Sequence, residues 1–91
     1  MSEKIDIPLD ARLKYVERRK QDLADCRTAI SKLDFKCLER VGHQIKGNAT
    51  TFGFDELSTI AIEMENQALK KDVEKLKTTL KKFETYLARL K

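Results

Sequence analysis

Apolar side chains recur along most of the chain at steps of three and four residues, the spacing that places them on one face of an α-helix. The first such stripe consists of Leu13, Val16, Leu23, Cys26, Ile30 and Leu33. It predicts a long helix over residues 9–32, preceded by an N-terminal segment over residues 1–8. Pro8 suits the start of this helix, because the first turn does not need the N–H that proline lacks.

Three shorter helices are predicted after the first, over residues 35–52, 55–70 and 73–90. Aspartate residues that can act as N-caps, Asp34, Asp55 and Asp72, stand before or at their starts, and Gly53 can end the second helix. The apolar stripe of the second helix is Phe35, Leu38, Gly42, Ile45, Ala49 and Phe52, and that of the third is Leu57, Ile60, Ala61, Met64 and Ala68. The stripe of the fourth helix is Val73, Leu76, Leu80, Phe83, Leu87 and Leu90.

Connections of a few residues force consecutive helices to run antiparallel. We therefore expect an all-α fold, an antiparallel up-down-up-down four-helix bundle that forms one domain over residues 1–91. A chain of this length can bury a single core without disulfides or metal ions. Its 37% charged residues and absence of tryptophan favour a compact helical protein.

Two apolar residues of the third helix, Ile62 and Leu69, lie off its stripe and seven residues apart. They would form a small exposed apolar patch or contact a neighbouring helix, and we expect the contact.

His43 is the one histidine of the chain, and the helical pattern turns it toward solvent. At about 100° per residue it points roughly 140° away from Leu38, at the centre of the apolar stripe. Its neighbours at helical spacing include the basic residues Lys36, Arg40 and Lys46. An exposed imidazole among cations suggests chemistry rather than packing.

Two glycines in the same helix need separate explanations, since each costs roughly 1 kcal/mol relative to alanine inside a helix. Gly42 lies on the apolar stripe, where it lets a neighbouring helix approach closely. Gly47 faces solvent one turn beyond His43, and bare backbone there suits a surface that a bulky partner must approach.

Glu65 is expected at nearly the same height as His43, because the two residues lie twelve and ten residues from the turn at Gly53. Its carboxylate would either hydrogen-bond one imidazole nitrogen and leave the other free to attack, or remain a solvated charge.

The rest of the sequence argues against several classes of function. Cys26 and Cys37 have no histidine or second thiol at metal-ligand spacing, so no zinc site is expected. No stretch has the length of a signal-peptide core or a membrane span, so we expect a cytoplasmic protein. The formal charge of +4 is modest and spread among acidic residues, so nucleic-acid binding is not expected. There is no nucleotide-binding loop or catalytic triad that would indicate autonomous catalysis.

The motif His43-x-x-Lys46-Gly47, followed by Phe52-Gly53, Leu57 and Met64-Glu65, resembles the histidine-containing phosphotransfer (HPt) domains of bacterial two-component phosphorelays, over essentially the whole chain. The resemblance implies that His43 takes a phosphoryl group from the aspartyl phosphate of a receiver domain and passes it to another. It further implies that Lys46 holds the phosphoryl group, Gly47 clears space for the receiver and Glu65 orients the histidine. Asn48 departs from the small residue common after that glycine.

On this hypothesis the chain is a phosphocarrier without kinase activity and binds no cofactor, and the magnesium ion belongs to the receiver. Its partners are response-regulator receiver domains and a hybrid histidine kinase, which dock on Lys36, Arg40, Gly47 and Thr50. The chain is expected to be a monomer. The main alternative is a helical adaptor that binds a partner through the same face without phosphorylation. The third hypothesis is a bundle that binds nucleic acid through the lysines of the fourth helix.

Overall fold

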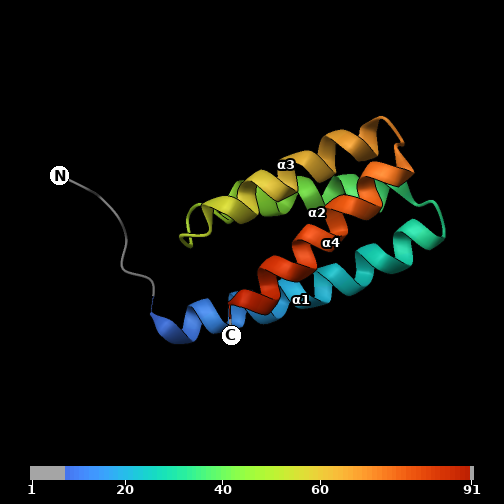
Figure 1. Cartoon of the computed structure of the whole chain (residues 1–91). Helices are drawn as coiled ribbons and strands as arrows, with labels where there is room; N and C mark the ends of the chain where they lie inside the picture. Colours follow the sequence, from blue (N-terminus) through green and yellow to red (C-terminus); the bar gives the residue numbers. More distant parts are fainter. Residues whose placement is uncertain (1–7, 91) are drawn as a thin grey trace.

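The structure is a computed structural model that describes residues 8–90. It contains four helices, α1 (Leu9–Ser31), α2 (Phe35–Asn48), α3 (Asp55–Leu69) and α4 (Val73–Arg89), and no strand among the described residues (Figure 1). The predicted all-α class is confirmed. Residues 1–7 of the expected N-terminal segment lie outside the described part of the chain.

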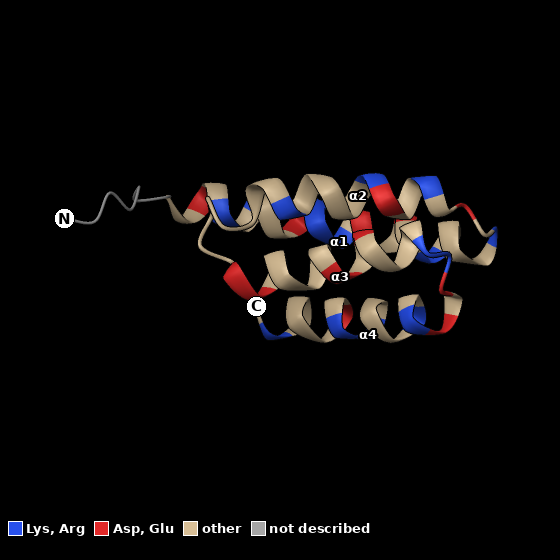
Figure 2. Ribbon diagram, turned by 90° about the horizontal axis from the view of Figure 1, so that it is seen from above, with Lys and Arg blue, Asp and Glu red and all other residues tan. Residues whose placement is uncertain are grey.

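The four helices form a ring of neighbours. α2 packs against α3, α3 against α4, α4 against α1 and α1 against α2. Figure 1 shows that the chain reverses direction at each connection, and Figure 2 shows α3 between α2 and α4. The arrangement is the antiparallel bundle that short connections require. Within residues 8–90, no helix combines the length and apolar character needed to cross a bilayer.

Side-chain caps start two of the helices as the sequence predicts. The Asp34 carboxylate accepts a hydrogen bond from the Cys37 N–H at 3.2 Å, and Asp72 accepts one from the Lys75 N–H at 3.2 Å. The expected cap at Asp55 is wrong. The N-cap of α3 is Phe54, without a side-chain hydrogen bond, and Asp55 is already the first helical residue, where its negative charge suits the helix dipole.

The helix ends differ from the pattern most at α2, which stops at Asn48 instead of residue 52. Residues after Asn48 form tighter turns, and the Phe54 N–H donates to the Ala49 carbonyl at 2.8 Å. The prediction that Gly53 ends this helix is wrong, because Gly53 lies five residues after Asn48 in the following turn, where its φ of 87° is in the left-handed region that glycine tolerates best. The other helices end one residue before the predicted position.

The core lies between the four helices and contains most of the predicted stripes, with Cys26, Leu38, Leu76 and Met64 fully buried. Leu13 and Leu33 are exceptions, since they are 52% and 58% exposed. Leu33 follows the end of α1 in a left-handed conformation, so the helical spacing no longer sets its direction.

Near Leu13, the residue of α1 that is buried in the core is Tyr15. The periodicity of the sequence did not predict this. The Tyr15 ring stacks on Phe52 and Phe54, with ring centroids 4.3 and 5.5 Å away. The Arg19 guanidinium lies over the Tyr15 ring, 4.5 Å from its centroid. Aromatic stacking at the end of the bundle therefore determines which face of α1 turns inward.

The expectation that Ile62 and Leu69 contact a neighbouring helix is wrong. Their exposed fractions are 42% and 58%, so they form the alternative, an apolar patch on the surface of α3. The neighbours of α3 cover its other sides, because α2 and α4 are the helices packed against it.

Gly42 marks the closest approach of α2 and α3. A Cβ atom at this position would lie 2.9 Å from the Ala61 carbonyl oxygen and 2.9 Å from the Glu65 backbone nitrogen. Both atoms belong to the backbone of α3, which cannot rotate away as a side chain can. The predicted packing role of Gly42 is therefore confirmed. At Gly47, by contrast, an added Cβ would meet nothing within 4 Å.

We predict that Gly42→Ala lowers the free energy of unfolding by about 1–2 kcal/mol, because overpacking against the α3 backbone outweighs the gain in helix propensity. Gly47→Ala is the matched control in the same helix and should raise the free energy of unfolding by about 0.5 kcal/mol. Urea denaturation of the two variants measures both values. Equal stability of the two variants would contradict the close contact.

Candidate functional site

His43 lies on the solvent face of α2, opposite the stripe that contains Leu38 and Ile45. Its side chain is 67% exposed, as the helical pattern predicts. An imidazole of this exposure is accessible to another protein without a change in the bundle.

One carboxylate of α3 contacts two side chains of α2. Glu65 of α3 places its Oε2 atom 3.0 Å from His43 Nδ1 and its Oε1 atom 2.7 Å from Lys46 Nζ. His43 and Lys46 are three residues apart on α2, so their side chains leave the helix on the same side. The contact expected from the register of the two helices around Gly53 is present, and the solvated-charge alternative for Glu65 is not what the structure shows.

The Glu65 carboxylate is held in its charged form. The hydrogen bond from Lys46 is the largest cause that lowers its pKa below the ordinary value of 4.5. Burial opposes this shift, and the hydrogen bond from His43 adds a further lowering. A charged carboxylate only accepts hydrogen bonds, so Nδ1 of a neutral His43 must carry the ring proton. The lone pair of Nε2 then points away from Glu65 and is free.

Lys46 is positioned through its backbone as well as its side chain. The Ser58 hydroxyl of α3 donates to the Lys46 carbonyl oxygen at 3.4 Å. This contact lies near the end of α2, where carbonyl groups no longer find partners within the helix. The Lys46 side chain is 37% exposed, so its ammonium lies between Glu65 and solvent.

A shallow depression beside the histidine is lined by Lys36, Glu39, Arg40, His43, Gln44 and Glu65. Two of the four expected docking residues, Lys36 and Arg40, therefore lie beside the ring. The other two, Gly47 and Thr50, do not line it. Thr50 is exposed but follows the end of α2, and its carbonyl accepts from the Gly53 N–H at 2.9 Å.

Some residues near the site were not predicted from the sequence. Ser58 shows only ordinary helical spacing, and its support of Lys46 depends on how α3 packs. The Asn48 side chain accepts a hydrogen bond from the Tyr15 hydroxyl, which fastens the end of α2 to α1. This contact gives a structural reason for an asparagine after Gly47.

The two cysteines and the acidic side chains do not form a second reactive or metal-binding site among the described residues. Burial raises the pKa of the Cys26 thiol to about 12, so it stays protonated. Cys37 is partly exposed and receives a long contact of 3.9 Å from Arg40. Among residues 8–90, no three histidine, cysteine, aspartate or glutamate side chains gather into a group that could hold a metal ion.

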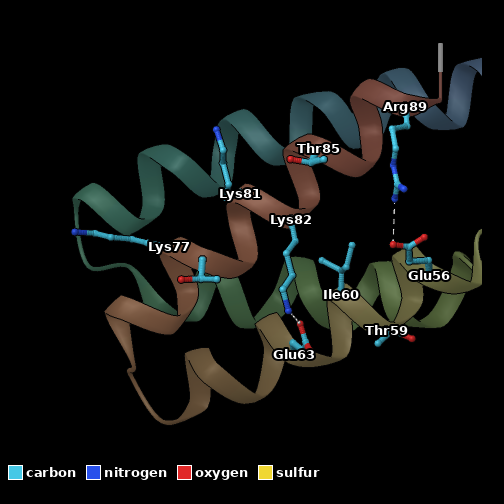
Figure 3. A pocket seen from close by; sticks show the side chains of 10 residues that line it. Glu56, Thr59, Ile60, Glu63, Lys77, Lys81, Lys82, Thr85 and Arg89 are labelled. Atoms are coloured by element: carbon cyan, nitrogen blue, oxygen red, sulfur yellow. Dashed lines mark hydrogen bonds and ion pairs between the residues drawn. The ribbon is translucent and has the colours of Figure 1, made fainter.

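A larger depression lies between α3 and α4, away from the histidine (Figure 3). Ion pairs cross it from Lys82 to Glu63 at 3.2 Å and from Arg89 to Glu56 at 3.1 Å. Neither histidine nor cysteine lines it. We therefore interpret it as the boundary between α3 and α4, which these ion pairs stabilise. His43 offers a nucleophilic side chain, and this depression does not.

We predict that the pKa of Glu65, followed by its carboxyl resonance in an NMR titration, lies below 4.5 and rises toward that value in Lys46→Met, because Lys46 is the largest cause of the lowering. Since the folded pKa is the lower one, these contacts stabilise the fold above pH 4.5, and that contribution is lost as the pH falls through the folded value. Lys82→Met, which removes a lysine paired with another glutamate, should leave the titration of Glu65 unchanged. The same midpoint in Lys46→Met and wild type would contradict the arrangement.

The sequence model of the Hpt domain family matches residues 11–91. The match covers the His43 site, α2, α3, α4 and all but the first two residues of α1. No curated protein and no solved structure matches the chain significantly.

Proposed function

Because the chain belongs to the Hpt domain family, we propose that it is a phosphocarrier in a two-component phosphorelay and that Nε2 of His43 accepts and donates the phosphoryl group. Hpt domains serve phosphotransfer in two-component systems and have no catalytic activity of their own. They interact with receiver domains and histidine kinases. The finer assignment to one atom of this chain rests on the geometry of its site.

The observation that carries the proposal is the contact of 3.0 Å between His43 Nδ1 and the Glu65 carboxylate. It fixes the ring proton on the inner nitrogen and leaves the outer nitrogen as a lone-pair donor. A histidine that is exposed, fixed in orientation and held in one tautomer has the properties of a nucleophile. A histidine used only for docking needs none of these constraints.

The proposed step moves a phosphoryl group from a receiver aspartate to the histidine, with one bond formed and one broken. The Nε2 lone pair attacks the phosphorus of a receiver aspartyl phosphate, the N–P bond forms and the P–O bond to the aspartate breaks. The electron pair of that bond returns to the aspartate as a carboxylate. The Nδ1 proton stays on the ring, where Glu65 stabilises the positive charge that the ring acquires. Donation to another receiver is the reverse of this step.

Cations around the ring supply the electrostatic part of the mechanism. Phosphoryl transfer needs alignment and charge stabilisation more than covalent work by the protein. Lys46 is one helical turn from His43, and its ammonium can turn from Glu65 toward an incoming phosphoryl group. Lys36 and Arg40 make the adjoining surface basic, which favours association with an acidic partner.

The proposed partners are response-regulator receiver domains, with a hybrid histidine kinase as a further source of a receiver. The magnesium ion that such transfer uses belongs to the receiver, and we assign no cofactor to this chain. Gly47 and Thr50 extend the docking surface along α2 and its following turn, where the missing side chain of Gly47 leaves room for the partner. The carrier itself is proposed to act as a monomer.

We predict that the wild-type chain, incubated with a phosphorylated receiver domain and magnesium, gains one acid-labile phosphoryl mass and that His43→Gln gains none. The exposure of His43 means that the substitution should leave the helical content and the receiver affinity unchanged. Intact-protein mass spectrometry and circular dichroism measure these properties. Phosphorylation of His43→Gln would overturn the site, and partner signalling that survives in this variant would favour the adaptor alternative.

Lys46→Met should slow phosphoryl transfer at least about tenfold, because it removes an ammonium that shares the Glu65 carboxylate with His43 while keeping a similar volume. The matched control is Lys82→Met, which removes a lysine paired with glutamate on the opposite side of α3 and should transfer at the wild-type rate. Single-turnover rates by rapid quench distinguish the two variants. Equal rates would refute the role of Lys46.

A further inference from the structure

Ile62 and Leu69 lie on the same face of α3 as Glu65. At about 100° per residue, Ile62 points roughly 60° and Leu69 roughly 40° from the direction of Glu65, both away from the buried stripe. The packing settles the orientation of this face, because Glu65 contacts His43 of α2, and Ser58, about two helical turns before it, contacts Lys46. The two apolar side chains therefore lie beside the histidine site, on the solvent side of it.

Along the axis of α3, the level of Glu65 and of the His43 ring that it contacts lies between Ile62 and Leu69. Ile62 precedes Glu65 by three residues and Leu69 follows it by four, which correspond to roughly 4.5 Å and 6 Å along the helix axis. Glu65 touches the imidazole at 3.0 Å. One exposed apolar side chain thus stands about a turn to either side of the ring.

Both side chains expose apolar surface to water, with exposed fractions of 42% and 58%. The rest of the neighbouring surface is polar or charged, since the depression on the other side of the ring is lined by Lys36, Glu39, Arg40 and Gln44. The surface around His43 thus has a basic side on α2 and an apolar side on α3. A partner that matches both sides needs acidic groups next to an apolar patch.

Transfer of a phosphoryl group requires the receiver to come into direct contact with the ring. A stable protein interface buries about 800 Å² on each partner, far more than one imidazole presents. An interface centred on His43 must therefore cover residues about one helical turn away in each direction. It cannot leave both Ile62 and Leu69 in water.

We infer that Ile62 and Leu69 form an apolar docking patch that binds an apolar surface of the receiver domain next to its acidic phosphorylation site. The inference rests on the proposed function, since it identifies how the phosphocarrier recognises its partner. The patch supplies affinity and leaves the chemistry to His43, Lys46 and Glu65.

The test is the double variant Ile62→Ser/Leu69→Ser, with Leu9→Ser as the control. Leu9 is 71% exposed on α1, a helix that contributes none of the residues of the His43 site. The receiver is the domain that binds the wild type most tightly in a panel of purified receivers. Two quantities are measured for each protein: the dissociation constant by calorimetry, and the transfer rate as a function of receiver concentration.

The patch predicts a dissociation constant and a half-saturating receiver concentration raised at least about tenfold in the double variant, from the loss of buried apolar surface. The transfer rate at saturating receiver should stay unchanged, as should both values for Leu9→Ser. Thermal denaturation should show a folded double variant, because the two positions are solvent-exposed.

The outcomes separate this inference from the proposed function. Unchanged affinity of the double variant, with normal transfer by the wild type, overturns the patch alone. A lower rate at saturation with unchanged affinity also overturns it, because the residues would then act on the chemistry. Weakened binding by the double variant, in a chain that accepts no phosphoryl group at His43, supports the patch and overturns the phosphocarrier. Absence of binding to every receiver overturns both.

Discussion

The close packing of α2 against α3 at Gly42 is the constraint on which the rest of the site depends. The backbone of α3 lies where any larger residue would place its Cβ, 2.9 Å from the Ala61 oxygen and the Glu65 nitrogen. This approach brings the Glu65 side chain within hydrogen-bond distance of His43, which lies next to Gly42 in the sequence. A larger residue at position 42 would push the two helices apart and hold the carboxylate further from the ring.

Glu65 serves two groups at once, and this sharing explains how so small a chain holds an exposed histidine in one orientation. One oxygen accepts from the imidazole and fixes its tautomer, while the other binds the Lys46 ammonium. The carboxylate side chain is 14% exposed, whereas the ring it orients is 67% exposed. The carboxylate is thus sheltered between two helices, and the ring that it orients faces solvent.

The sequence predicted the four helices, their antiparallel order, the exposure of His43 and its contact with Glu65, because helical periodicity and the glycine turn determine direction and height. It failed where packing decides between similar residues. Tyr15 takes the core position in place of Leu13 through its aromatic stack, and Ile62 and Leu69 are exposed because, among residues 8–90, only α2 and α4 pack against α3. Ser58 has no local signal, since its contact with Lys46 exists only after α2 and α3 have packed.

The most direct test of the account is the nitrogen to which the phosphoryl group is attached. The chain, labelled with ¹⁵N in its single histidine, is phosphorylated by a receiver domain and its imidazole resonances are recorded with and without ³¹P decoupling. The account predicts that ³¹P coupling appears on Nε2 while Nδ1 keeps its proton and its bond to Glu65. Coupling on Nδ1, or a phosphoryl group that couples to neither nitrogen, would contradict it.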